Sequence, residues 1–289
     1  MAKTAVIEVI NQDLVETFRA FFKNLLEQDE ISAILVPWRL PMKNMVMPTL
    51  ITDPERLSGA DPLSPAFPMN SAKIVSRLTR KESGGKVAAV MRSCEIRAFI
   101  ELVKLKQGRT ENLVIIGIDC LGALRNTDYF RFAGNDAAAA TQRFYESMLA
   151  GKEAALDGVE LASACKSCEH SIPDAADIAL ALRGVDIGTG ILAQAQSPAG
   201  EALLAQLNLP AAEVPKARED ALARLLEART ASRDQMFAET AAATDSVEKL
   251  SNYMANCVNC YNCRVACPVC YCKECVFVTD VFNHDPAQY

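Results

Sequence analysis

Apolar positions in the first 120 residues alternate between two patterns, and this alternation predicts the fold class. Short runs rich in β-branched residues are typical of buried strands, whereas apolar residues at helical spacing predict the helices between them. The expected strands are 4–10, 31–36, 86–91 and 112–118, and the expected helices are 14–26, 71–80 and 95–107. Strands that alternate with helices in this way predict an α/β domain with a mostly parallel sheet.

The remainder of the chain divides into segments of different character. Residues 37–68 hold seven prolines without regular periodicity, and a loop of that length usually covers or carries a site. An alanine-rich helix is expected over 135–155, and a glycine-rich break or domain edge over 184–198. Helices follow over 199–250, the longest at about 217–242; they show no convergent polar cluster and are interpreted as scaffold. The expected division is an α/β domain (1–190), a helical segment (191–250) and a small ferredoxin-like cysteine module (251–289).

Composition and charge exclude several classes of function. The formal net charge is −6, the isoelectric point is near 5.2, and lysine and arginine are scattered, so nucleic acid is not an expected partner. The first residues lack the apolar core of a signal peptide, and no stretch has the roughly 18 apolar residues that a membrane span needs. We therefore expect a soluble, cytoplasmic protein.

Eleven cysteines are many for 289 residues, and their close spacing argues against complete pairing as disulfides. Without an export signal, metal binding explains them better. Because only two histidines are present, His170 and His284, an imidazole-based zinc hydrolase lacks ligands. The metal chemistry expected of this chain is thiolate chemistry.

The clearest motif lies near the C-terminus and has the spacing C-x2-C-x2-C-x3-C-P of bacterial ferredoxins. Its ligands are Cys257, Cys260, Cys263 and Cys267, followed by Pro268. Three thiolates at this spacing can hold three corners of a 4Fe-4S cluster, while the fourth serves the same or a second cluster. A structural zinc site is the alternative, but zinc ribbons separate their cysteine pairs by longer loops.

Three further cysteines follow this run without repeating its spacing: Cys270, Cys272 and Cys275. They are either spare thiols or ligands of a second cluster, for which His284 would be an eighth ligand; an exposed terminal histidine is the simpler interpretation. Tyr261, Tyr271 and Phe277 either cover a cluster or pack against a neighbouring subunit.

A second, dispersed set of cysteines is expected at one edge of the sheet. Cys94 stands where the strand 86–91 gives way to a helix, and Cys120 follows the strand 112–118. A right-handed crossover makes these strands parallel and places both thiols at the carboxyl edge, where open α/β sheets bind ligands. The helix N-terminus is expected to favour a thiolate at Cys94. Cys165 and Cys168 add a CxxC pair that could complete a four-thiolate site; the alternative is that Cys94 and Cys120 are small buried apolar residues.

Several motifs, in this order, resemble the deazaflavin (coenzyme F420)-dependent hydrogenase/dehydrogenase beta-subunit family, which includes formate dehydrogenase beta subunits. The likeness extends over about 34–190. Its carriers are Met47–Leu50, Arg92–Ala98, Ile116–Cys120, Cys165–Cys168 and Pro173–Ile178. The resemblance implies an α/β flavoprotein that holds FAD and a 4Fe-4S cluster, with Cys94, Cys120, Cys165 and Cys168 as its ligands. Together with the C-terminal run, about two and at most three clusters are expected.

The chain departs from the family pattern in two ways. Many members carry their ferredoxin cysteines ahead of the α/β domain rather than after it, and the glycine-bearing flavin loop is replaced here by Asn70-Ser71-Ala72-Lys73. The candidate flavin contacts are Asn70, Ser71, Lys73, Arg92 and Arg97. Their alternative role is structural, as capping or surface residues.

The expected function is that of an oxidoreductase subunit whose substrate site lies in a partner. The partners would be subunits of a formate dehydrogenase, hydrogenase or heterodisulfide-reductase-like complex, and the carrier a deazaflavin, a nicotinamide or a ferredoxin. A flavin-free iron–sulfur relay and a zinc-bound assembly module are the two alternatives.

Overall fold

The computed structural model describes residues 4–41, 44–81, 84–152 and 158–272. The described strands are β1 (Thr4–Glu8), β2 (Ile31–Arg39), β3 (Val46–Ile51), β4 (Lys86–Met91), β5 (Leu113–Ile118), β6 (Ile178–Ala181) and β7 (Gly190–Ala195). The described helices are α1 (Leu14–Leu26), the 3-10 helix η1 (Pro54–Gly59), α2 (Ala72–Leu78), α3 (Ser93–Lys104), α4 (Asn126–Ala133), α5 (Ala137–Leu149), α6 (Ser163–Lys166), α7 (Pro198–Gln206), α8 (Lys216–Ala243), α9 (Val247–Tyr253) and α10 (Asn262–Ala266).

The described strands form one sheet with the order β1-β7-β6-β5-β4-β2-β3. Neighbouring strands from β6 to β2 are parallel, whereas β7 pairs antiparallel with both β1 and β6, and β3 pairs antiparallel with β2. The sheet is therefore mixed, and only β7 and β3 oppose the common direction. The α/β class and the four strands expected from the hydrophobic pattern are confirmed.

Two expectations about loops were wrong. The proline-rich segment 37–68 contains β3, which tolerates Pro48 because it is an edge strand and need not donate a hydrogen bond at every residue. The expected break at 184–198 contains β7, so the sheet extends beyond residue 190. A Cβ at Gly190 would lie 2.4 Å from Cγ2 of Val6, and the absence of that carbon lets β7 approach β1.

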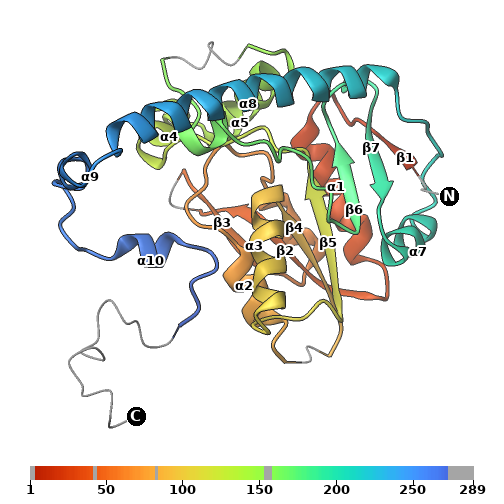
Figure 1. Cartoon of the computed structure of the whole chain (residues 1–289). Helices are drawn as coiled ribbons and strands as arrows, with labels where there is room; N and C mark the ends of the chain where they lie inside the picture. Colours follow the sequence, from red (N-terminus) through yellow and green to blue (C-terminus); the bar gives the residue numbers. More distant parts are fainter. Residues whose placement is uncertain (1–3, 42–43, 82–83, 153–157, 273–289) are drawn as a thin grey trace, which may run out of the picture.

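Helices cover both faces of the sheet, as the alternation of buried side chains requires. Successive residues of β2 and β4 belong to opposite apolar clusters: Ile34 and Ala88 face the larger cluster, and Leu35 and Ala89 face the smaller one. Helix α1 lies in the larger cluster, whereas α2 and α3 lie in the smaller one, on the other face (Figure 1). The fold thus has three layers.

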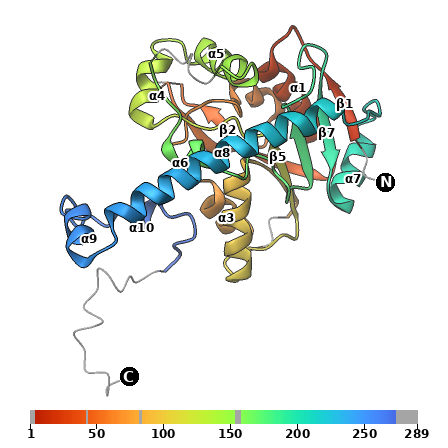
Figure 2. The ribbon, with the colours of Figure 1, turned by 45° about the horizontal axis from the view of Figure 1, so that its top comes forward.

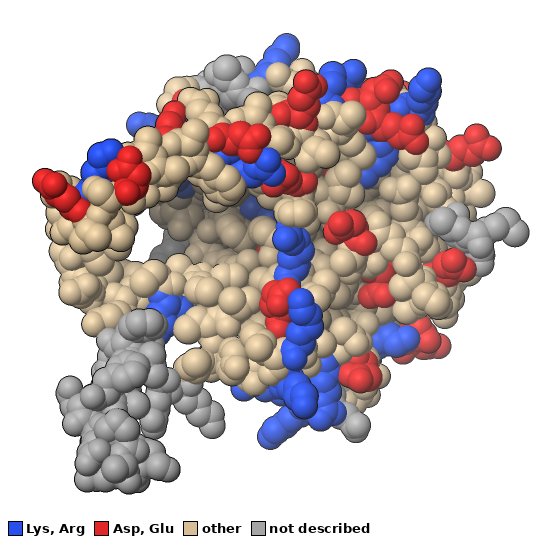
Figure 3. Space-filling model, viewed as in Figure 1, with Lys and Arg blue, Asp and Glu red and all other residues tan. Residues whose placement is uncertain are grey.

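Helix α8 lies outside these layers. It runs across one edge of the sheet and leads to α9 and α10, which extend from the α/β body as an arm (Figure 1 and Figure 2). Figure 3 shows a hollow between this arm and the body. Among the described residues, no helix is long and apolar enough to cross a membrane.

Candidate functional site

The expected meeting of two cysteines at one sheet edge is confirmed. Strands β4 and β5 pair in parallel, with Met91 opposite Gly117 at their carboxyl ends. Cys94 is the second residue of α3, directly after β4, and Cys120 lies two residues beyond the end of β5. Both thiols therefore lie at the carboxyl edge, the place where open α/β sheets bind ligands.

The segment that carries the CxxC pair is fastened to the same edge by backbone hydrogen bonds. The amide of Cys120 donates to the carbonyl of Ser171 over 2.7 Å, and the amide of Ala162 donates to the carbonyl of Ala123 over 2.8 Å. Between these two attachments lie α6 and Cys168. A Cβ built on Gly122 would lie 3.6 Å from Cβ of Cys165, which places that cysteine beside the turn after β5.

Electrostatic effects add to burial and connect the cysteines: Cys120 and Cys165 raise the pKa of Cys94, and Cys165 and Cys168 raise that of Cys120. Burial, followed by the charge of Cys120, raises the pKa of the Cys94 thiol, although Cys94 reaches the protein surface. Burial likewise raises the pKa values of Cys120 and Cys168. The expectation that the start of α3 favours a thiolate at Cys94 was wrong, because burial and the charges of Cys120 and Glu95 raise the pKa of this thiol more than the charge of Arg92 lowers it.

The donor set fits an iron–sulfur cluster in its chemistry. Thiolate sulfur is the ligand that such clusters take, and the positive charge of bound iron offsets the cost of ionising crowded thiols. In the described part of the chain, no three His, Cys, Asp or Glu side chains converge closely enough to hold one metal ion. A cuboidal cluster instead takes each thiolate at a separate corner.

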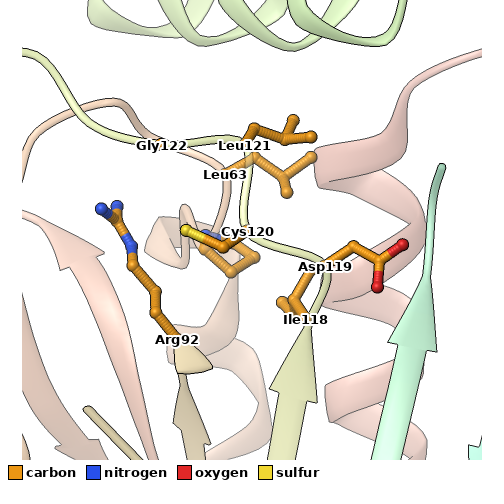
Figure 4. A pocket seen from close by; sticks show the side chains of 8 residues that line it. Leu63, Arg92, Ile118, Asp119, Cys120, Leu121 and Gly122 are labelled. Carbon is orange, nitrogen blue, oxygen red and sulfur yellow. The ribbon is translucent and has the colours of Figure 1, made fainter. Parts of the chain in front are cut away.

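Arg92 closes the site on the side of the proline-rich loop. Its guanidinium donates to the carbonyls of Ser64 and Ala66 over 2.7 and 3.1 Å and lies 4.8 Å from the ring centre of Phe67. Figure 4 shows the Cys120 sulfur pointing toward the side where Arg92 lies. The positive charge of Arg92 lowers the pKa of Cys120, in opposition to the larger effect of burial.

The residues predicted to contact a flavin lie around the starts of α2 and α3. The Asn70 side chain accepts from the amide of Ala72, and the amide of Ser71 donates to Glu95 over 2.8 Å. The other carboxylate oxygen of Glu95 accepts from the Arg92 amide, also over 2.8 Å. Lys73 donates to a carbonyl of the C-terminal arm, and Arg97 is exposed on α3.

The cavity beside Arg92, one of these five residues, is too small for a flavin. The cavity lined by Arg92, Leu63 and Cys120 has a volume of about 20 Å³, far below the roughly 300 Å³ at which ligand pockets begin. Asn70, Ser71, Lys73 and Arg92 also have partners within the chain. Two hydroxyl groups nearby, those of Ser71 and Ser93, are buried without a hydrogen-bond partner. The flavin role of the five candidates stays a prediction.

The interpretation of residues 199–250 as scaffold stays a prediction, although polar side chains of α8 lie beside the segment that carries the CxxC pair. Ser232 lies with its hydroxyl 3.4 Å from that of Ser167, and Arg233 forms an ion pair with Glu169. Near its start, Arg218 forms an ion pair with Asp119, the residue before Cys120. The signal that could have indicated this is the recurrence of polar residues on one helix face, which apolar periodicity does not reveal.

The described part of the C-terminal run lies at the end of the arm. Cys257, Cys260, Cys263 and Cys272 are exposed, and Cys267 and Cys270 are partly buried. Asn259 and Tyr261, which stand between the first three cysteines, adopt left-handed φ values of 52° and 56° that turn the chain sharply. Cys275, Phe277 and His284 lie outside the described residues, so the expectations about them stay predictions.

The arm returns to the α/β body beside α2. Lys73 donates through Nζ to the carbonyl of Val265 over 3.3 Å, and Val269 packs against the apolar cluster that contains α2 and α3. Val269 stands between Cys267 and Cys270, so this contact places the end of the cysteine run against the helices that start near Asn70 and Cys94. Tyr261 and Tyr271 remain exposed.

Comparison with known proteins finds two relatives among formate dehydrogenase subunits. The chain is 24% identical, over 287 residues, to the F420-dependent formate dehydrogenase subunit beta of Methanocaldococcus jannaschii, with 90% of this chain and 74% of that protein covered. It is 23% identical over 291 residues to the F420-dependent formate dehydrogenase 1 subunit beta of Methanococcus maripaludis, with 90% and 73% covered. The chain is a distant homologue of these beta subunits.

The fold of this beta-subunit homologue also has a counterpart among solved structures. A chain of the F420-reducing [NiFe] hydrogenase complex from Methanosarcina barkeri matches with a TM-score of 0.59 and 12% identity, covering 85% of this chain and 94% of that one. No family model matches the sequence. The resemblance inferred from the cysteine motifs is confirmed by the relatives, and the solved structure supports the fold.

Proposed function

We propose that the chain is an iron–sulfur electron-transfer subunit of an oxidoreductase complex related to F420-dependent formate dehydrogenases and hydrogenases. One observation carries the proposal: three segments far apart in sequence bring Cys94, Cys120 and the Cys165–Cys168 pair to the carboxyl edge of one sheet. Cysteines that served only as small apolar residues would have no reason to gather there. The relatives are named as beta subunits of such enzymes, which supports the same conclusion.

In this proposal the side chains at the carboxyl edge of the sheet have separate roles in holding and covering the cluster. A 4Fe-4S cluster, when bound, supplies one-electron transfer, and the four cysteines hold it. Arg92 fastens the proline-rich loop over the site and places positive charge beside Cys120. Leu63 and Leu121 line the small cavity next to Cys120 and limit the access of water.

The C-terminal run serves electron exchange with a partner in the same proposal. Its spacing is that of a ferredoxin cluster, and the described cysteines lie on an arm that extends from the body. Exposure favours contact with another subunit, of formate dehydrogenase, hydrogenase or heterodisulfide-reductase type. The carrier at the other end would be a deazaflavin, a nicotinamide or a ferredoxin.

A second candidate is a relay without flavin. It is favoured by the small cavity at the site and by the structural roles of Asn70, Lys73 and Arg92. Acid extraction of the anaerobically purified protein distinguishes a flavin-containing subunit from a flavin-free relay. Released flavin in near-stoichiometric amount supports FAD binding, whereas iron and sulfide without flavin support the relay.

The proposal is tested by metal analysis of two matched cysteine variants. We expect the anaerobically purified chain to contain about eight irons and as many acid-labile sulfides. Cys120→Ser and Cys260→Ser should each remove about four, because each disables one site. Zinc in place of iron would instead establish the assembly module. Iron content that Cys120→Ser leaves unchanged, while Cys260→Ser removes all of it, would exclude the site at the sheet edge.

A further inference from the structure

Helix α8 is attached to the body through charged and polar side chains rather than through an apolar face. Of its 28 residues, only Arg218 and Arg229 are buried. The large apolar residues Leu226 and Phe237 are 49% and 59% exposed. Since an apolar stripe does not hold the helix in place, the reason for its position has to be found in the two arginines and their neighbours.

One face of α8 lies against the CxxC segment. The hydroxyl of Ser167 lies 3.4 Å from that of Ser232 and donates to the sulfur of Met236 over 3.9 Å. Glu169, one residue beyond Cys168, forms an ion pair with Arg233. Residues 229, 232, 233 and 236 have the spacing i, i+3, i+4 and i+7, which places them on a single helix face.

Arg229 therefore faces the same segment as its neighbours on that face. Its side chain is buried, with a relative exposure of 7%. Cys168 stands between Ser167 and Glu169, which both contact this face, so Arg229 lies one helical turn from the contacts that flank Cys168. Glu169 in turn is paired with Arg233.

The cysteine site thus receives positive charge from three elements. Arg92 stands directly after β4 and lines the same small cavity as Cys120, Arg97 lies on α3, and Arg229 lies on α8. Glu95 is the acidic neighbour of Cys94, and its two oxygens accept backbone hydrogen bonds from Ser71 and Arg92. Arg229 differs from Arg97 in being buried, so its charge is less screened by solvent and salt.

We propose that Arg229 tunes the reduction potential of the cluster held at the sheet edge, so that α8 is a functional part of the cysteine site. This inference rests on the proposed function. A reduced cluster carries one more negative charge than an oxidised one, and a nearby buried cation stabilises the reduced form. Arg229 is accordingly a positioning residue that acts through charge and does not ligate iron.

The experiment uses the full chain, purified without oxygen, and compares Arg229→Gln with Arg229→Lys. Arg224→Gln is the matched control, since Arg224 is an exposed arginine of the same helix. The readout is a redox titration followed by electron paramagnetic resonance. The signal of the sheet-edge cluster is identified as the one that Cys120→Ser abolishes.

We expect Arg229→Gln to lower the midpoint potential of that signal. The ratio of oxidised to reduced cluster at a fixed ambient potential should rise on the order of tenfold, which corresponds to about 59 mV for one electron. Arg229→Lys should keep a value near that of the natural chain because it keeps the charge, and Arg224→Gln should not change it. An unchanged potential in Arg229→Gln with its iron intact would overturn the inference.

If Arg229→Gln loses the cluster, Arg229→Lys shows whether the charge or the shape of Arg229 is responsible. Iron content and potential restored by Arg229→Lys would support a role of charge, whereas loss of iron in both variants would show that shape alone matters and would overturn the inference. Failure of the proposed function has a different signature: the natural chain would then show no signal that depends on Cys120.

Discussion

Asp119 and Arg218 form a buried, bidentate ion pair next to Cys120 of the site. Nη1 and Nη2 of Arg218 lie 2.6 and 3.0 Å from the two carboxylate oxygens of Asp119. The Asp119 side chain is wholly buried and also accepts from the amides of Leu182 and Arg183. Because Cys120 follows Asp119, the start of α8 is tied to the strand end that carries the cysteine.

Removal of the arginine from this pair is expected to destabilise the chain strongly. Arg218→Leu leaves a buried carboxylate without its counter-charge, and breaking such a pair typically costs about 3–5 kcal/mol in free energy of unfolding. Denaturant titration measures this cost. Arg224→Gln on the same helix should change the free energy by less than about 0.5 kcal/mol. A similar, small effect of both variants would show that the pair contributes little.

Gly184 is expected to be necessary for the approach of α8 to the sheet. Its φ is +68°, and an added Cβ would lie 2.3 Å from Cα of Arg218. Gly184→Ala should therefore displace the first turn of α8 and speed amide hydrogen exchange in residues 216–222. Gly188→Ala is the control, because its nearest neighbour is the flexible Asp186 side chain at 3.3 Å. Equal exchange in the two variants would contradict the close approach.

A second glycine fixes the loop that carries the CxxC pair. A Cβ on Gly117 would lie 2.1 Å from Cβ of Pro173, which is five residues beyond Cys168. Gly117→Ala should push this loop away from β5 and, if the proposed site is correct, lower the iron content by up to about four per chain. Iron that stays at the level of the natural chain in soluble, folded Gly117→Ala protein would argue against this geometry.

Asp61 is expected to make stability depend on pH. Its side chain is wholly buried and accepts from Arg39 and Thr141 through one oxygen, while the other has no partner; burial raises its pKa. The native state then keeps the proton to higher pH than the unfolded chain does. Protonated Asp61 therefore contributes its full stability below pH 3.8, the pKa of this side chain in the unfolded chain. This contribution is lost as the pH rises toward the higher pKa that Asp61 has in the folded chain.

The test for Asp61 compares the natural chain with Asp61→Asn between pH 4 and pH 7. The free energy of unfolding of Asp61→Asn minus that of the natural chain should increase with pH, by up to about 1.4 kcal/mol per unit between the two pKa values. A difference independent of pH would show that Asp61 has the same pKa in both states.

The sequence determined the parts of this protein that depend on local chemistry. Buried strands such as 86–91 and 112–118 were evident because both of their faces are apolar, and the helix 14–26 because one of its faces is. The parallel direction of β4 and β5 followed from the crossover rule, which placed Cys94 and Cys120 at the same edge, whereas their direct pairing is seen only in the structure. The ferredoxin spacing of the last cysteines is likewise a local property of the chain.

Only the tertiary structure decided the features that depend on distant neighbours. Strand β3 exists because β2 offers it an edge, although Pro48 argues against a strand. Helix α8 lies at the cysteine site because Arg218 pairs with Asp119 and Arg233 pairs with Glu169. The hydrophobic periodicity of the sequence does not predict these contacts. The energy of a buried ion pair depends on the removal of water from both partners, and the fold, not the adjacent sequence, determines which residues lose that water.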